Sequence, residues 1–352
     1  MIKKILPAMI GVALAGGMAV AQADVTVMGH IDTSITSDDI DGGQGDDDTN
    51  FTCTTCSVGF KGSEDLGNGL KAVFKLDFQY DTTQANDPGL KDRDQWMGLA
   101  GNFGRVVVGT ISTPYKSYGA KIDPLYRTAL QGRDHGLQSI YHSKAGEELQ
   151  GRADNTARYD SPSWNGLKLA AFYTLDSDDD VEDDNPYGAG VSYENGGILA
   201  FGSWQTNNGG NSNPAGEQTA WKVGGKWTLN NFAVMGQYEN GNEDTTDTDF
   251  YHWTVAASYT MGNNLLYAGY GAANADGDVE DDKDATSYTI AAVHNMSKRT
   301  SVYLGYTTSD CDASGSNLGQ LGSYASVCSA VEQGSTEGGD NTRIALGMKH
   351  KF

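Results

Sequence analysis

The sequence lacks long hydrophobic runs. After residue 20 it contains no stretch of the ~18 consecutive apolar residues that a membrane-spanning helix requires, which excludes helical membrane spans. The hydrophobic content of 38% is also low for a packed globular core. There is no HExxH, GxSxG or Walker lysine motif, so the usual signatures of zinc proteases, serine hydrolases and nucleotide-binding enzymes are missing. Two classes remain, an exported soluble protein and a membrane barrel built from strands.

The first residues have the pattern of an export signal. Lys3 and Lys4 precede an apolar stretch from residue 5 to about residue 20, and Ala21-Gln22-Ala23 offers the small-x-small pattern that signal peptidase cuts. A membrane-spanning helix is disfavoured because the stretch is short, rich in Gly and Ala, and followed at once by a polar segment. The sequence therefore predicts that residues 1–23 are removed on export and that the mature chain starts near Asp24.

The last residues alternate strictly between apolar and polar side chains. Abundant Gly (46) and Tyr (18) beside a formal net charge of -22 complete an unusual composition. A water-filled barrel accounts for both features, because only one face of each strand meets lipid while the lumen stays polar. The predicted outer face of the final strand carries Ile344, Leu346, Met348, His350 and Phe352, and the inner face carries Arg343, Ala345, Gly347, Lys349 and Lys351.

The same two-residue alternation recurs along the chain, between short tight turns and long acidic or Gly/Asn-rich connections. This asymmetry is typical of outer-membrane barrels, whose turns are periplasmic and whose loops are extracellular. The pattern predicts one all-β domain over residues 24–352, a 16-stranded antiparallel transmembrane β-barrel with both termini on the periplasmic side. The predicted strands lie at about 25–32, 57–62, 70–80, 93–101, 105–111, 154–162, 167–175, 187–194, 197–205, 219–229, 231–239, 250–260, 265–273, 285–294, 299–308 and 341–352.

One connection, residues 112–153, is much longer than the others. It contains Pro114, Pro124 and charges of both signs. A structureless loop of that length is uncommon in a compact protein unless it has a function. The sequence predicts that this loop folds into the lumen, where its backbone groups find partners and where it narrows the pore.

Several motifs resemble those of Gram-negative general porins of the proteobacterial type. The resemblance covers essentially the whole mature chain. It implies a homotrimeric 16-stranded outer-membrane channel with an inward-folded third loop, and it implies that Phe352 helps the barrel assembly machinery recognise the chain. The motifs are the segment 59–72 (GFKGSEDLGNGLKA), Gly101-Asn102-Phe103-Gly104, Thr113-Pro114, Asp123-Pro124, Arg158-Tyr159-Asp160-Ser161-Pro162 and the closing His350-Lys351-Phe352.

The resemblance also implies a pore constriction in which acids on the third loop face a basic cluster on the wall. Such opposed charges create a transverse field that favours polar and charged solutes. Arg158 is the first choice for the wall, because Ala157 and Tyr159 are assigned to the outer face and parity turns Arg158 inward. The candidates are Asp123, Asp134, Glu147 and Glu148 on the loop, and Arg158, Arg93, Lys75 and Lys61 on the wall. The alternative is that some of these are ion pairs inside the barrel or anchors at the lipid boundary.

The charge balance predicts a preference for cations. Thr110 follows Gly109 at a position where the family often has Arg, and only 22 Lys and Arg remain once Lys3 and Lys4 are removed from the total of 24. Nineteen of the 46 acids fall in three runs, 38–48, 176–184 and 276–284, between predicted strands. Such runs are usually solvated loops. Calcium or magnesium binding is the alternative, although the runs lack the ordered Gly and distal Glu of an EF-hand, and no cofactor is otherwise expected.

Four cysteines are unusual in such a chain. In an oxidising exported compartment disulfides are the default, and proximity in sequence favours Cys53–Cys56 and Cys311–Cys328 among the three pairings. A thioredoxin-like redox site at Cys53 and Cys56 lacks a βαβ context, and a four-thiolate zinc site is the other alternative.

The function predicted from the sequence is passive diffusion of ions and small hydrophilic solutes through the outer membrane, without enzymatic activity. The predicted partners are two further copies of the chain, outer-membrane lipid and lipopolysaccharide, the barrel assembly machinery and the solutes, with no nucleic acid. The alternative is an exported β-rich carbohydrate-binding protein or enzyme, with calcium as a candidate ligand, in which Trp side chains stack on sugars.

Overall fold

The structure is a computed structural model that describes residues 24–40, 48–84, 89–132, 151–175, 185–207, 217–244, 248–276, 283–311 and 339–352. The predicted signal peptide, residues 1–23, lies outside this described part. Within it, no helix is both long and apolar enough to span a membrane.

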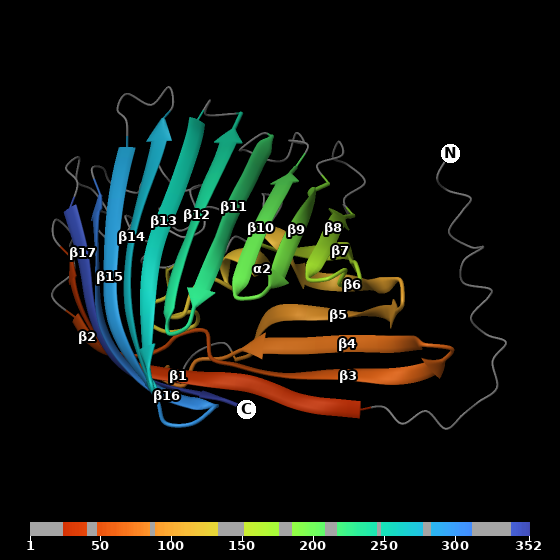
Figure 1. The fold of residues 1–352 in the computed structure, drawn as a ribbon, viewed down its shortest axis with the longest axis horizontal. Coiled ribbons are helices and arrows are strands. Elements are labelled where there is room, and N and C mark those ends of the chain that lie inside the picture. The colour runs from red at the N-terminus through yellow and green to blue at the C-terminus, as the bar shows by residue number, and fades with distance from the viewer. Residues whose placement is uncertain are drawn as a thin grey trace.

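The described chain consists almost entirely of antiparallel strands (Figure 1). Strand bounds agree with the predicted ladder to within a few residues for most strands, because alternating apolar and β-branched side chains suit a pleated surface with one face in lipid. The elements are β1 (Asp24–Ile40), β2 (Asp48–Cys53), β3 (Ser57–Gly67), β4 (Leu70–Gln79), β5 (Lys91–Gly101), β6 (Gly104–Ser112), α2 (Pro114–Gly119), β7 (Arg152–Asp160), β8 (Leu167–Thr174), β9 (Tyr187–Asn195), β10 (Ile198–Thr206), β11 (Gln218–Leu229), β12 (Phe232–Glu243), β13 (Thr248–Met261), β14 (Asn264–Asp276), β15 (Lys283–Asn295), β16 (Thr300–Cys311) and β17 (Gly339–Lys351).

The strands close into a ring. Each strand from β3 to β17 pairs with its neighbour in sequence, and β1 pairs with β17 to complete the circle. Both β2 and β3 pair with the other edge of β1, end to end, so the 17 described segments occupy 16 positions of the wall. Residues 54–56 separate these two segments, which together form the second strand of the predicted 16-stranded barrel.

The alternation predicted for the final strand is confirmed. Ile344, Leu346 and Met348 are 51%, 55% and 53% exposed on the outer face, whereas Ala345 and Lys349, which have the other parity, are buried. The closing residue completes the seam, since the backbone groups of Phe352 and Gly29 exchange two hydrogen bonds of 3.1 Å each. An apolar outer face and a polar interior are the requirements for a lipid-embedded barrel.

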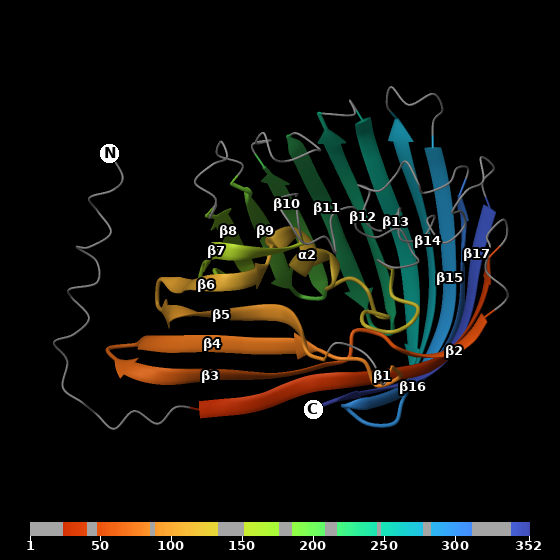
Figure 2. The same cartoon turned by 180° about the vertical axis from the view of Figure 1, so that it is seen from behind.

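The third loop folds inward, as predicted. Thr113 caps α2 by accepting a hydrogen bond from the backbone of Lys116, and Pro114 occupies the first turn, where its missing N–H costs nothing. Tyr118 and Ile122 pack against the inner face of β10–β12, and Leu125 and Leu130 pack against β15–β17. Figures 1 and 2 show the strands curving around the space in which α2 lies. The described part of the loop therefore follows the inner wall across the lumen.

The sequence prediction was wrong about the extent of the first strand. The alternation ends near residue 32, yet β1 continues to Ile40 because its second half pairs with β2 on one side and with β17 on the other. Asp38 consequently belongs to the wall, where it forms an ion pair with Arg343 at 2.5 Å. Asp276 and Asp284 also lie within strands. Two of the acidic runs, 38–48 and 276–284, thus extend into the wall, whereas the run 176–184 lies outside the described residues.

Candidate pore constriction

Asp94 joins the two ends of the inward-folded loop to the wall. Its carboxylate accepts hydrogen bonds from the backbone and hydroxyl of Ser112, at 3.2 and 2.6 Å, just before the loop begins. It also accepts one from Arg152, at 2.9 Å, just after the loop ends. Lys75 on β4 donates a fourth bond of 2.9 Å. Four strands, β4 to β7, therefore meet at one half-buried carboxylate.

A β-bulge brings Arg93 to the inner face beside Asp94, which already shares the inner parity of Trp96, the partner of Lys75. Leu76 pairs with Gln95 and Phe78 pairs with Asp92, so Asp77 alone opposes the two residues Arg93 and Asp94. A bulge of this kind redirects side chains, because one extra residue interrupts the alternation. Arg93 and Asp94 both contact lumen side chains although they are adjacent in sequence.

Asp77 is the centre of a second group of charges. Arg93 lies 3.5 Å from its carboxylate and donates to Gln79 at 2.8 Å. Arg127, contributed by the loop, lies 4.0 Å from the same carboxylate. Arg127 also donates to His30, at 2.9 Å, and adopts the left-handed backbone conformation with φ of 60°, which a non-glycine residue keeps only where its surroundings hold it. The loop thus places a cation against the wall formed by β1, β3, β4 and β5.

Arg158 lies on the inner face of β7, as parity predicted. Its guanidinium donates to Asp160 at 2.6 Å and to the backbone carbonyl of Ser112 at 2.5 Å. Arg105 binds the same carboxylate at 2.6 Å. Tyr159, which follows Arg158 in β7, is 38% exposed on the opposite face. Arg158 therefore lies on the inner face of the barrel and also binds the end of β6, where the loop begins.

The other predicted residues fall in different situations. Asp123 lies on the loop and is buried, and its carboxylate accepts from the backbone N–H groups of Leu125 and Gly132, at 2.8 Å each. Lys61 lies opposite Lys75 in the β3–β4 register and is exposed. Asp134, Glu147 and Glu148 lie outside the described residues, and so does Cys328. Cys53 and Cys56 form the first predicted disulfide.

A buried ion pair holds α2 against the opposite wall. Lys222 on β11 donates to Glu239 on β12 at 3.2 Å, with both side chains almost fully buried. The Tyr115 hydroxyl donates to the same carboxylate, and the Lys222 ammonium lies 3.8 Å from the centre of the Tyr115 ring. Burial on the wall also raises the pKa of the Tyr118 phenol, which keeps it neutral. The start of the loop is therefore fixed by charge as well as by apolar packing.

Several residues of this site were not predicted from the sequence. Alternation could have marked Asp77, Lys222 and Glu239 as inward-facing, since each lies in a predicted strand whose other parity carries apolar or aromatic side chains. Asp94 likewise has the inner parity of β5, whereas Arg127 has no such pattern because its position depends on the path of the loop. Among the described residues, no group of three or more His, Cys, Asp or Glu side chains could hold a metal ion.

A closed barrel with an apolar outside, a charged interior and an inward-folded loop defines an outer-membrane channel protein. Comparison with known families agrees, because residues 8–314 match the family described as Gram-negative porin. The chain belongs to that family and is an integral protein of the Gram-negative outer membrane.

Two curated relatives illustrate the similarity. Outer membrane porin protein 32 of Delftia acidovorans is 27% identical over 97% of this chain and 98% of its own length. Major outer membrane protein P.IB of Neisseria meningitidis is 32% identical over 54% of this chain, and the match covers 56% of that protein.

Solved structures support the fold alone, because their sequences are distant. The anion-selective porin from Comamonas acidovorans has a TM-score of 0.76 at 22% identity and covers 94% of this chain and all of its own. The trimer form of OmpT from Vibrio cholerae has a TM-score of 0.66 at 14% identity, covering 94% and 99% of the two chains.

Proposed function

We propose that this porin is a passive diffusion channel for ions and small hydrophilic solutes. The observation that carries the proposal is the group formed by Asp77, Arg93 and Arg127, in which a loop inside the closed ring places its own charge against a charged wall. Charged groups that line an aqueous passage attract polar and ionic solutes and offer apolar ones no favourable contact.

The finer part of the proposal is a preference for cations. Three predicted basic residues of the wall are paired with an acid within 4 Å, Lys75 with Asp94, Arg93 with Asp77 and Arg158 with Asp160. The same acids also bind Arg152, Arg127 and Arg105, so this local group carries more cations than acids. The proposed preference rests instead on the field of the whole chain, whose formal net charge is -22. A negative field raises the local concentration of cations. Anion selectivity, which the name of the Comamonas acidovorans porin states, is the competing expectation.

Planar-bilayer recording tests both parts. The chain, extracted from outer membranes in detergent, should insert as discrete conductance steps. Under a salt gradient, the zero-current potential should have the sign of a cation-preferring pore. Conductance steps whose zero-current potential has the sign of an anion-preferring pore would overturn only the proposed cation preference. Folded protein that gives no conductance steps would overturn the proposed channel function. Swelling of liposomes in small sugars would separately measure the passage of uncharged solutes.

We also propose that the functional assembly is a homotrimer in lipid and lipopolysaccharide, inserted by the barrel assembly machinery. The resemblance to general porins supports this, as does the trimer form named for the Vibrio cholerae relative. Unheated samples should migrate on a denaturing gel as a trimer and heated ones as a monomer. Monomeric migration after mild extraction and chemical cross-linking would contradict it. The alternative of an exported carbohydrate-binding protein or enzyme is not supported by the family or by the polar interior.

A further inference from the structure

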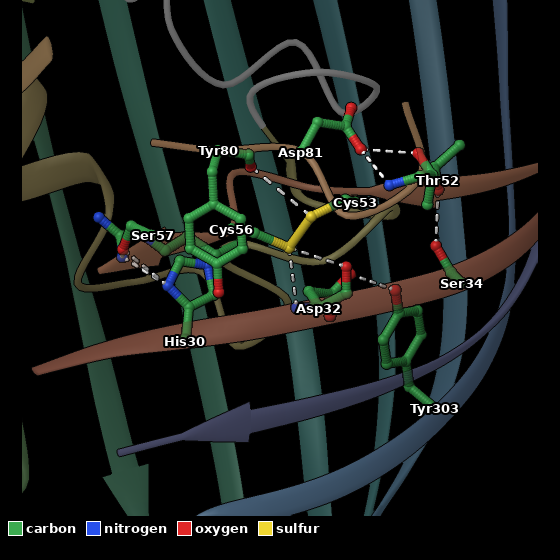
Figure 3. Close-up of a disulfide and its surroundings, with 12 residues drawn as sticks. His30, Asp32, Ser34, Thr52, Cys53, Cys56, Ser57, Tyr80, Asp81 and Tyr303 are labelled. Carbon is green, nitrogen blue, oxygen red and sulfur yellow. Dashed lines mark hydrogen bonds between the residues drawn. A yellow bond between two sulfur atoms is a disulfide. The ribbon is translucent and has the colours of Figure 1, made fainter. Parts of the chain in front are cut away.

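The break between β2 and β3 is bridged by the Cys53–Cys56 disulfide, beside the place where the constriction loop meets the wall. Ser57 pairs with Gln79, so the disulfide lies just beyond the last paired residues of β3 and β4. Figure 3 shows it between β1 and the segment with Tyr80 and Asp81 that follows β4. The pore function does not by itself explain why a covalent bond is needed here.

One chain of contacts leads from the disulfide to the loop. The backbone N–H of Asp32 points to the sulfur of Cys56 at 3.3 Å. The Tyr303 hydroxyl donates to the Asp32 carboxylate at 2.8 Å (Figure 3). It also accepts a hydrogen bond of 3.2 Å from the backbone N–H of Ala129 in the loop. Asp32 and Tyr303 are both almost fully buried. We call Asp32, Tyr303 and Ala129 the loop latch.

A second chain of contacts starts at the next residue. The Ser57 hydroxyl lies 3.2 Å from the His30 ring, and Arg127 of the loop donates to both, at 3.3 and 2.9 Å. Arg127 holds the left-handed backbone conformation described above, which costs free energy unless neighbours compensate. Residues 56 and 57 therefore support the loop at two points, Ala129 and Arg127.

The surroundings suit the reduced form of the cysteines as well as the disulfide. The carbonyl of Asp32 lies 3.4 Å from the sulfur of Cys56, and the carbonyl of Tyr80 lies 3.7 Å from that of Cys53. Each carbonyl can accept a hydrogen bond from a thiol. Cys53 is half-buried, whereas Cys56 is fully buried. An incoming thiolate therefore reaches Cys53 first, and Cys56 becomes the leaving sulfur.

We propose that the Cys53–Cys56 disulfide, which we call the clasp, undergoes exchange with small thiols. While it is intact, it keeps the contacts of the loop latch formed and so stabilises the open pore. The proposal rests on the channel function proposed above. A small thiol, as its thiolate, attacks the sulfur of Cys53, and the S–S bond breaks with its electron pair on Cys56, which takes a proton. A second thiolate attacks the sulfur of the bound small thiol, which releases the Cys53 thiolate to be protonated and forms the small-molecule disulfide. Two small thiols are oxidised as one protein disulfide is reduced.

Reduction of the disulfide removes the covalent link across residues 54–56. The contacts that lead from residues 56 and 57 to Ala129 and Arg127 are then less firmly held. The loop then leaves its position along the wall more often and blocks the lumen. We expect the ratio of closed to open time in single-channel records to rise roughly five-fold on reduction, the effect of losing about one net hydrogen bond. The conductance of the open state should stay the same.

The experiment compares single channels of the full chain before and after dithiothreitol, which is the thiol probe. Mass spectrometry after iodoacetamide reports which cysteines became free. The Cys53→Ser/Cys56→Ser double variant should show the raised closing ratio from the start and no further response. Cys311→Ser/Cys328→Ser, the matched control, should respond like the original chain. Tyr303→Phe, which removes the latch hydroxyl, should close more often without any reductant.

Two results would overturn the proposal. One is an unchanged closing ratio although Cys53 and Cys56 are labelled, a test that needs no variant and so does not depend on variants folding. The other is a response to dithiothreitol that persists in Cys53→Ser/Cys56→Ser. Either result leaves the channel function standing as long as the oxidised chain conducts, whereas the absence of conductance from oxidised chain would end the channel proposal itself.

Discussion

Asp94→Asn is the substitution that most directly links the geometry of the constriction to ion flow. The carboxylate has two cationic partners, Lys75 and Arg152, both at 2.9 Å. An amide has nearly the same shape but carries no charge, so Asp94→Asn leaves both cations beside the lumen without their shared acid. The constriction gains one positive charge while the wall keeps its volume.

The expected shift in selectivity follows from Coulomb's law. An ion that passes about 5 Å from the carboxylate in water interacts with it by about 0.8 kcal/mol. With a Debye length of about 10 Å at 0.1 M salt, this falls to about 0.5 kcal/mol. Cations lose this attraction and anions lose the same repulsion, so the ratio of cation to anion permeability should fall about five-fold.

The same substitution should weaken the base of the loop. Four hydrogen bonds converge on Asp94, two of them from Ser112. Charge-assisted bonds contribute about 1.5–3 kcal/mol each when intact, and the amide keeps part of this set. Because the side chain is 17% exposed, we expect a loss near the low end, about 2 kcal/mol in the free energy of unfolding.

The first assay measures the zero-current potential of many inserted channels across a salt gradient, which reports ion selectivity. The second is a urea unfolding curve, which reports the free energy of unfolding. Glu64→Gln is the matched control, because it removes the same charge from a residue on the outer face of the barrel. Glu64 shares the outer parity of Phe60, which is 41% exposed. The reasoning is refuted if Asp94→Asn and Glu64→Gln shift the potential equally. It is also refuted if Asp94→Asn moves selectivity toward cations.

Further predictions concern other parts of the barrel. Arg158→Gln removes a lumen cation and should raise cation preference about as much as Asp94→Asn lowers it, and an unchanged zero-current potential would exclude Arg158 from the constriction. Lys222→Met removes the ammonium group that binds buried Glu239 and should lower the unfolding free energy by about 3 kcal/mol, measured in urea; a loss below ~1 kcal/mol would contradict the buried pair. Deleting Phe352 removes both seam hydrogen bonds to Gly29 and should reduce the fraction of heat-modifiable barrel in outer membranes, with wild-type amounts as the contrary outcome.

Local alternation was enough to predict most of the wall. Lys75 and Arg158 face inward because the two-residue period of a strand leaves no choice once Tyr159 and Leu76 face lipid. The inward path of the described loop residues, 113–132, followed from the length of the connection, because long backbone segments need polar partners that lipid cannot supply. The number of strands followed from counting alternating segments.

The sequence by itself determined the succession of alternating strands and the inner side of the regular ones, since alternation depends on neighbours within a few residues. Tertiary structure alone decided the arrangement of charge at the constriction. Arg93 turns inward beside Asp94 only because β4 and β5 pair with a bulge, and Arg127 reaches Asp77 only because the loop crosses the lumen. Register and loop path are set by contacts between residues far apart in the chain, which no local period encodes.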